Sequence, residues 1–193
     1  MNKFAKCITK EDMSKLPLKA FDGKIYIVEN EDDIINAVSV LKESETIGFD
    51  TETRPSFKKG RINKVALLQL SSSDNAFLFR LNGNGLHKAV AELLADKEIV
   101  KVGVAIRDDI IALKKLKKFE PQSFIELQTY VKKFGIQNFS LQKLTAIVLG
   151  FRISKSKRLS NWEAEKLGIG QLKYAATDAW VSLEVYKKLL NTT

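Results

Sequence analysis

The sequence predicts an α/β fold, with α+β as the alternative, built on one central sheet with helices on both faces. Two observations carry this prediction. Three apolar segments follow one another with short links, which is typical of an antiparallel meander: residues 46–50, 64–70 and 76–79. From residue 86 onward, apolar strands alternate with segments of helical spacing, which indicates βα units added to the same sheet.

The expected elements begin with a strand over residues 24–28. Asn30, with Asp33 three residues later, is a typical N-cap arrangement for the helix that follows. After the meander the sequence predicts, in order, a helix at 86–94, a strand at 99–104, a helix opened by Asp108 or Asp109, a mixed strand-helix segment at 124–134, a helix at 141–149 ended by Gly150, a Ser- and Lys-rich loop at 151–161 and a final helix at 171–190.

Residues 1–24 form a basic lead-in, interrupted by Pro17 and Gly23. The sequence leaves open whether this lead-in is a docked arm or a frayed tail. We expect residues 25–193 to form a single domain, because a chain of 193 residues fits one domain with a sizeable core.

The chain has 32 Lys and Arg against 23 Asp and Glu, a formal net charge of +9. This excess indicates a polyanionic partner, with nucleic acid ahead of an anionic membrane surface. No run of 18 apolar residues and no apolar signal core occurs, so we expect no membrane span and a cytoplasmic protein. The single cysteine, Cys7, excludes an internal disulfide and a cysteine-built zinc site.

The apolar strand at 46–50 ends in two carboxylates, Asp50 and Glu52. Side chains alternate faces along a strand, so these two acids point to the same side of the sheet. Two like charges in a half-buried place are costly unless a cation offsets them. The pair therefore indicates a divalent metal site, and carboxylate ligands favour Mg²⁺ or Mn²⁺. The alternative is a solvated strand end that carries two acids.

Two more acidic places accompany this pair. Asp108 and Asp109 follow the strand at 99–104, where a carboxylate can face the first two acids or simply cap a helix. Tyr174 and Asp178 are four residues apart and share one face of the final helix. An Asp on an otherwise apolar helical face indicates a function, because unpaired buried carboxylates are rare.

These residues together resemble a known family. The stretch Phe49-Asp50-Thr51-Glu52, an acid after a Val-Gly strand, and Tyr174-Ala175-Ala176-Thr177-Asp178 are similar to the DEDDy group of 3′–5′ exonucleases, in particular the exonuclease domain of the Werner syndrome protein and its stand-alone relatives. The resemblance covers roughly residues 25–190. It implies a ribonuclease H-like fold with a central mixed sheet flanked by helices.

The resemblance also implies a role for each acid. Asp50, Glu52, Asp109 and Asp178 would hold two divalent cations, Mg²⁺ or Mn²⁺, with Asp50 bridging them; Asp108 is the other choice in the second motif. Tyr174 would orient the attacking water, which places the chain in the tyrosine subclass. The implied activity is hydrolysis of phosphodiester bonds from the 3′ end of DNA, releasing nucleoside 5′-monophosphates. The alternatives are an exoribonuclease of the ribonuclease D type and a catalytically silent nucleic-acid-binding module.

The basic excess has a use in this scheme. Basic side chains after the first motif and before Trp162 are candidates for contacts with backbone phosphates. Phe57, beside the first of these groups, is a candidate for stacking on a terminal base. The expected nucleic-acid-binding residues are Arg54, Phe57, Lys58, Lys155, Lys157 and Arg158. No phosphate loop of the helicase type occurs, so we expect no fused helicase, and any unwinding partner would be a separate chain.

Overall fold

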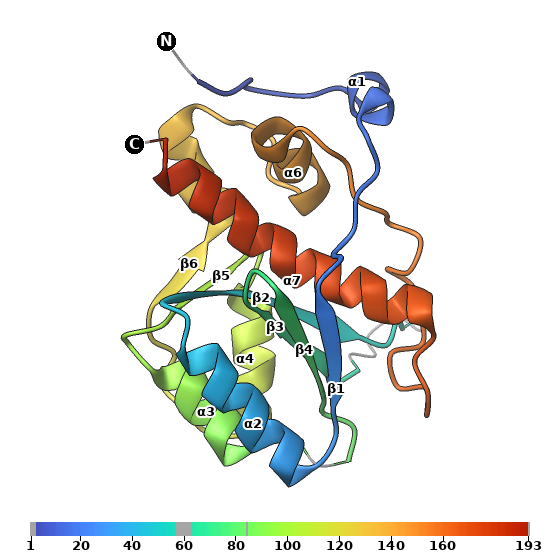
Figure 1. Ribbon diagram of the computed structural model, residues 1–193, viewed down its shortest axis with the longest axis vertical. Helices are drawn as coiled ribbons and strands as arrows, with labels where there is room; N and C mark the ends of the chain where they lie inside the picture. The colour runs from blue at the N-terminus through green and yellow to red at the C-terminus, as the bar shows by residue number, and fades with distance from the viewer. Residues whose placement is uncertain (1–2, 57–62, 84, 193) are drawn as a thin grey trace.

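A mixed sheet of six strands forms the centre of the molecule (Figure 1). The computed structural model describes residues 3–56, 63–83 and 85–192. The elements, in chain order, are α1 (Lys10–Lys15), β1 (Lys24–Val28), α2 (Glu31–Lys42), β2 (Thr46–Thr53), β3 (Val65–Ser71), β4 (Asn75–Arg80), α3 (Lys88–Ala95), β5 (Val100–Gly103), α4 (Arg107–Leu116), β6 (Phe124–Glu126), α5 (Leu127–Tyr130), the 3₁₀ helix η1 (Val131–Phe134), α6 (Leu141–Leu149) and α7 (Ile169–Leu190).

The strand order is β1-β4-β3-β2-β5-β6. Strands β2, β3 and β4 pair antiparallel, which confirms the predicted meander, while β1, β5 and β6 each join the sheet in parallel. The sheet is therefore mixed, with the βα units added beside β2 as the alternation of strand and helix predicted.

Helices cover both faces of the sheet, with α7 on one and α2, α3 and α4 on the other (Figure 1). Leu67 and Leu78 pack with Ala175 of α7, whereas Leu68 and Phe79, one residue further along their strands, belong to the core under α2, α3 and α4. This division follows from the alternation of side chains along each strand. No helix in the described part of the chain is long and apolar enough to cross a membrane.

Helix α7 lies unusually close to β2 because of one glycine. A Cβ built on Gly48 would lie 2.0 Å from the carbonyl oxygen of Ala179. The small side chains of Ala175, Ala176 and Ala179 on α7, all fully buried, also permit this approach. The contact sets the height of α7 above the strand that carries Asp50.

The basic lead-in is a docked arm between residues 16 and 21. Arg152 donates its backbone N–H to Pro17 and its Nε to Leu16, and Lys19 donates its N–H to the carbonyl of Arg152. The Phe21 side chain is buried, and the backbone N–H of Phe21 donates a hydrogen bond to the hydroxyl of Thr177 in α7. The arm therefore holds the start of the loop between α6 and α7 against the domain.

Candidate functional site

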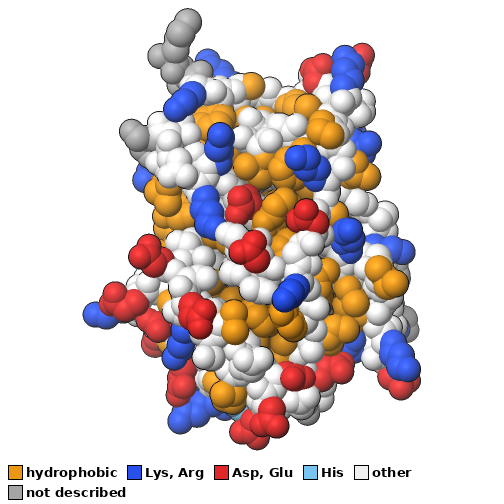
Figure 2. All heavy atoms as spheres, viewed as in Figure 1, with side chains coloured by type: hydrophobic (Ala, Val, Ile, Leu, Met, Phe, Trp, Pro, Cys, Tyr) orange, Lys and Arg blue, Asp and Glu red, His pale blue; other side chains and the backbone are white. Residues whose placement is uncertain are grey.

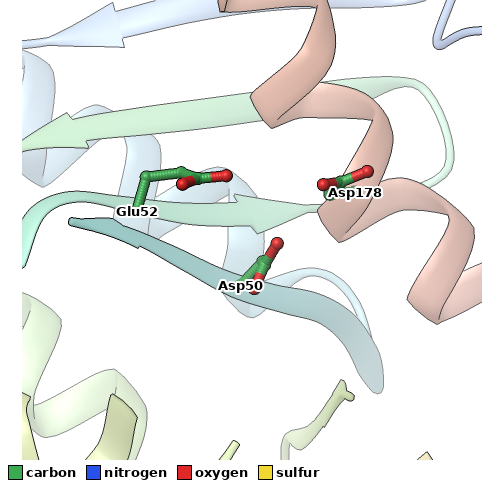
Figure 3. A group of neighbouring side chains, drawn as sticks. All are labelled: Asp50, Glu52 and Asp178. Carbon is green, nitrogen blue, oxygen red and sulfur yellow. The ribbon is translucent and has the colours of Figure 1, made fainter. Parts of the chain in front are cut away.

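Three carboxylates from two distant parts of the chain converge at β2. One oxygen each of Asp50, Glu52 and Asp178 lies within 4.8 Å of the other two. Figure 3 shows Asp50 and Glu52 on β2 facing Asp178 on α7. The predicted convergence of the first two acids is confirmed, and the final helix adds the third.

The backbone explains why the acids meet inside the sheet. Strand β2 continues to Thr53, three residues beyond the predicted end at Asp50, because β3 keeps pairing with it after β5 has stopped. Asp50 pairs with Gln69 and Glu52 with Leu67, so both acids belong to a regular ladder with alternating side chains. Their carboxylates thus share the α7 face of a rigid element.

Burial, together with the crowding of like charges, raises the pKa values of the three acids. Burial raises the pKa of Asp50 well above its ordinary value, and the charges of Asp178, Glu52 and Asp109 raise it further. Burial, with the charges of Asp178 and Asp109, raises the pKa of Glu52 to about 9. Burial raises the pKa of Asp178 to about 7, against an opposing hydrogen bond from Tyr174. Without a cation the fold thus disfavours the ionised forms of all three acids.

A divalent cation fits these residues. Asp178 is 4% exposed, and its Oδ1 has no hydrogen-bond partner within the described residues. A buried carboxylate oxygen without a partner is costly, and a cation would satisfy it. The donor set is made of carboxylate oxygens alone, which suits a hard ion such as Mg²⁺ or Mn²⁺.

Asp109 lies outside this three-acid cluster but close to it. It sits in the first turn of α4 and accepts a hydrogen bond from the hydroxyl of Thr51 on β2. Its charge contributes to the raised pKa values of Asp50 and Glu52, and burial raises the pKa of Asp109 itself. The fourth acid of the predicted set is thus brought beside the other three.

The alternative that an Asp caps α4 is wrong. The N-cap residue is Ile106, which makes no side-chain cap, and Asp108 is exposed in the first turn. The N–H groups before the helix are accepted instead by Glu126 of β6. Sequence reasoning missed Glu126, because nothing local links it to a helix that begins 19 positions earlier.

Tyr174 is a buried neighbour of the acids. Its ring is 7% exposed and lies 6.0 Å, centroid to centroid, from the ring of Trp162, a fully buried core residue. Burial raises the pKa of Tyr174 above its ordinary value, and the negative charges of Asp178 and Glu52 raise it further. The hydroxyl is therefore protonated at neutral pH and available as a hydrogen-bond donor.

The predicted nucleic-acid-binding residues separate into three groups. Phe57 and Lys58 lie outside the described residues. Arg54 forms an ion pair with Glu163, with 3.1 Å between Nη1 and Oε2. Lys155, Lys157 and Arg158 remain, all exposed on the loop that precedes α7.

This loop turns toward the acids. Lys157 packs over Gly170 in the first turn of α7, where a Cβ would lie 2.9 Å from the Lys157 Cε. The positive charge of Arg158 opposes the rise in the pKa of Glu52, so the guanidinium acts on the acid cluster. A hollow of about 210 Å³ opens beside Tyr174, with Ser154 and Ser156 of the same loop in its wall. The loop thus borders the acids and the tyrosine.

Known proteins are similar to this chain in both sequence and fold. The chain is 33% identical over 196 residues to the mouse bifunctional 3′–5′ exonuclease/ATP-dependent helicase WRN, covering 96% of this chain and 14% of that protein. It is 31% identical to an Arabidopsis thaliana 3′–5′ exonuclease, covering 90% of this chain and 66% of that one. The chain thus spans less than two thirds of the length of these two relatives.

Among solved structures, the Aedes aegypti Nibbler EXO domain superposes with a TM-score of 0.78 at 25% identity, covering 91% of this chain and 94% of that one. Escherichia coli RNase D superposes with a TM-score of 0.77 at 21% identity, covering 87% of this chain and 44% of that one. These likenesses, with the mixed sheet, confirm the predicted ribonuclease H-like fold. A family model described as 3′–5′ exonuclease matches residues 25–193. The chain therefore belongs to the 3′–5′ exonuclease family.

Proposed function

We propose that this chain hydrolyses phosphodiester bonds from the 3′ end of DNA with two divalent cations and releases nucleoside 5′-monophosphates. The observation that carries the proposal is the convergence of Asp50, Glu52 and Asp178, with Asp109 beside them, in a family of 3′–5′ exonucleases. DNA comes first because the resemblance of the sequence motifs to the exonuclease domain of the Werner syndrome protein implies it, whereas the likeness to E. coli RNase D, at 21% identity, concerns the fold alone.

Each acid has a part in holding the cations. Asp50, Glu52 and Asp178 would bind one ion, and Asp109, with Asp50 shared, would bind the other. When bound, two divalent ions favour attack by water on one side of the phosphate and stabilise the leaving 3′-oxygen on the other. Tyr174 would position the attacking water with a neutral hydroxyl, since its raised pKa excludes a phenolate base at neutral pH.

Digestion of DNA and RNA labelled at the 3′-terminal nucleotide tests the proposal. We expect labelled nucleoside 5′-monophosphate from DNA in Mg²⁺ or Mn²⁺ and none with a chelator. Faster release from RNA would identify an exoribonuclease, the second candidate. Binding of either substrate without release of label in any metal would identify a silent binding module.

Tyr174→Phe should lower kcat about 100-fold, the usual cost of misplacing a reacting group by about an ångström. The change removes the hydroxyl but keeps the ring against Trp162, so the fold should stay intact. Tyr186→Phe is the matched control, because it removes the hydroxyl of another tyrosine with a largely buried ring from the same helix, three turns away. Single-turnover rates measure the effect, and equal rates for Tyr174→Phe and the wild type would remove Tyr174 from the mechanism.

The triple substitution Lys155→Ala, Lys157→Ala and Arg158→Ala should flatten the salt dependence of DNA binding. Three lost phosphate contacts lower the slope of log K against log[salt] by about 2 for a single strand. The matched control removes three exposed lysines from the far end of α4: Lys115, Lys117 and Lys118. On the face shown in Figure 2, basic and acidic side chains are interspersed, with no single large basic patch. Equal slopes for the two triple variants would place the contacts elsewhere.

A further inference from the structure

The fourth acid, Asp109, is placed beside the site by the turn that joins β5 to α4. Pairing between β5 and β2 ends at Gly48, and β5 itself ends at Gly103, where a Cβ would lie 2.6 Å from the carbonyl oxygen of Phe49. The chain then turns into α4 beside the second half of β2. Asp109 therefore approaches the strand along the edge that β5 leaves free.

One hydrogen bond ties Asp109 to this edge. The Thr51 hydroxyl donates to Oδ1 of Asp109. Thr51 stands between Asp50 and Glu52, and alternation turns its side chain to the opposite side of the strand. Consecutive residues of one rigid strand thus carry two of the acids and hold the fourth.

A second set of hydrogen bonds holds the turn that leads into α4. Oε1 of Glu126 accepts the N–H of Ala105 at 2.9 Å and that of Gln128 at 3.0 Å, and its Oε2 accepts the N–H of Ile106 at 2.9 Å. Ala105 has a φ of +60°, a left-handed conformation that is uncommon for a residue with a Cβ. Glu126 therefore stabilises a strained turn from which Asp109 follows within one helical turn.

We propose that Thr51 and Glu126 are positioning residues that keep the Asp109 carboxylate where it completes the second cation site. A tether is needed because the charge of Asp109 repels those of Asp50 and Glu52, and an untethered carboxylate would turn toward solvent. Thr51 holds the carboxylate itself, and Glu126 holds the backbone that carries it. This inference rests on the proposed function, because that function assigns Asp109 to the second ion.

Thr51→Val and Thr51→Ser separate the hydroxyl from the shape of the side chain. Valine keeps the β-branched form that suits a strand but cannot donate, whereas serine keeps the donor. In Mn²⁺ titrations followed by electron paramagnetic resonance, Thr51→Val should weaken the second ion about 10- to 100-fold and leave the first unchanged. Thr51→Ser should restore the second ion. The kcat of Thr51→Val should fall at fixed Mn²⁺ and recover at higher Mn²⁺, with KM for DNA unchanged.

Thr9→Val is the matched control, since the Thr9 hydroxyl also donates to a carboxylate, that of Asp12, in the exposed helix α1. It should leave both ions and kcat unchanged. Glu126→Gln should weaken the second ion in the same direction, because its amide group cannot accept all three N–H bonds. Glu120→Gln, at an exposed acid, controls for the loss of one negative charge.

Crystal structures of the metal-free variants judge the inference without activity. In Thr51→Val the Asp109 side chain should leave its place beside β2, and in Thr51→Ser it should stay. Unchanged Asp109 and two tightly held ions in Thr51→Val would overturn the inference. A wild-type chain that binds no Mn²⁺ would reject the proposed function instead, while the metal-free structures would still decide whether Thr51 holds Asp109.

Discussion

Asp50→Asn should abolish nuclease activity and at the same time stabilise the metal-free protein. Asp50 is the acid that the charges of Asp178, Glu52 and Asp109 all act on, so it holds the central position among the ligands. A bound ion contributes several kcal/mol of transition-state stabilisation, so its loss should cost about a thousandfold or more in rate. The gain in stability has the opposite cause, because the amide removes one buried charge from a repelling set.

Release of label from DNA and urea denaturation in a chelator measure the two effects on the same preparation. Asp108→Asn is the matched control, because Asp108 is exposed and its charge raises the pKa of Asp109 but is not among the causes of the raised pKa of Asp50, Glu52 or Asp178. It should keep both the activity and the stability of the wild type. Loss of activity in Asp50→Asn together with a lower unfolding free energy would point to a damaged fold rather than a lost ligand.

The metal-free protein should lose stability as the pH rises from about 5 to 9. Burial raises the pKa of Asp178 to about 7 and that of Glu52 to about 9. Carboxyls in the unfolded chain titrate near about 4. Between these values the folded chain binds more protons than the unfolded chain, so the unfolding free energy falls as the pH rises. The stabilising contribution is complete below the unfolded pKa and is lost on passing through the folded pKa values.

A difference of one pKa unit corresponds to about 1.4 kcal/mol, so the two raised pKa values together predict a loss on the order of 8 kcal/mol between pH 5 and pH 9. Mg²⁺ should offset part of this loss, since a cation pairs with the ionised acids and binds only the folded chain; at 100 times its Kd it adds about 2.7 kcal/mol. Urea denaturation at pH 5, 7 and 9, with chelator or with Mg²⁺, measures both effects. Asp178→Asn should flatten the pH dependence, and Asp22→Asn, at an exposed acid, should not. A stability that rises with pH in chelator would contradict the repulsion among the acids.

Local patterns in the sequence were sufficient to predict most of the fold. The strand over Lys24–Val28, the N-cap Asn30 and the helix that Gly150 ends with a φ of +73° all lie where the sequence places them. Each depends on residues within one turn or one strand: apolar periodicity, a side chain that caps an N–H, or a glycine that tolerates a left-handed backbone. Such signals do not require knowledge of distant segments.

Other features could not be predicted because they depend on packing between segments. Lys101 reads as an ordinary strand residue, yet it is fully buried, with its Nζ donating to the carbonyls of Asp96 and Ile99. Trp162 could equally have faced nucleic acid, but it is core against Tyr174. Arg54, which is expected to contact phosphates, also forms an ion pair with Glu163 that no local pattern predicts. Burial by neighbouring elements, which no local pattern records, decides the place of Lys101 and of Trp162, and Arg54 meets its partner 109 positions away.

The same division applies to the site. By itself the sequence determined that Asp50 and Glu52 share one face and that Tyr174 and Asp178 share another, because the periods of strand and helix require it. Only the tertiary structure decided that these two faces meet, through the close approach of α7 at Gly48, and that Asp109 rather than Asp108 turns inward. The reason is physical: a local period sets the direction of a side chain, whereas the distance between two elements depends on the surfaces that pack between them.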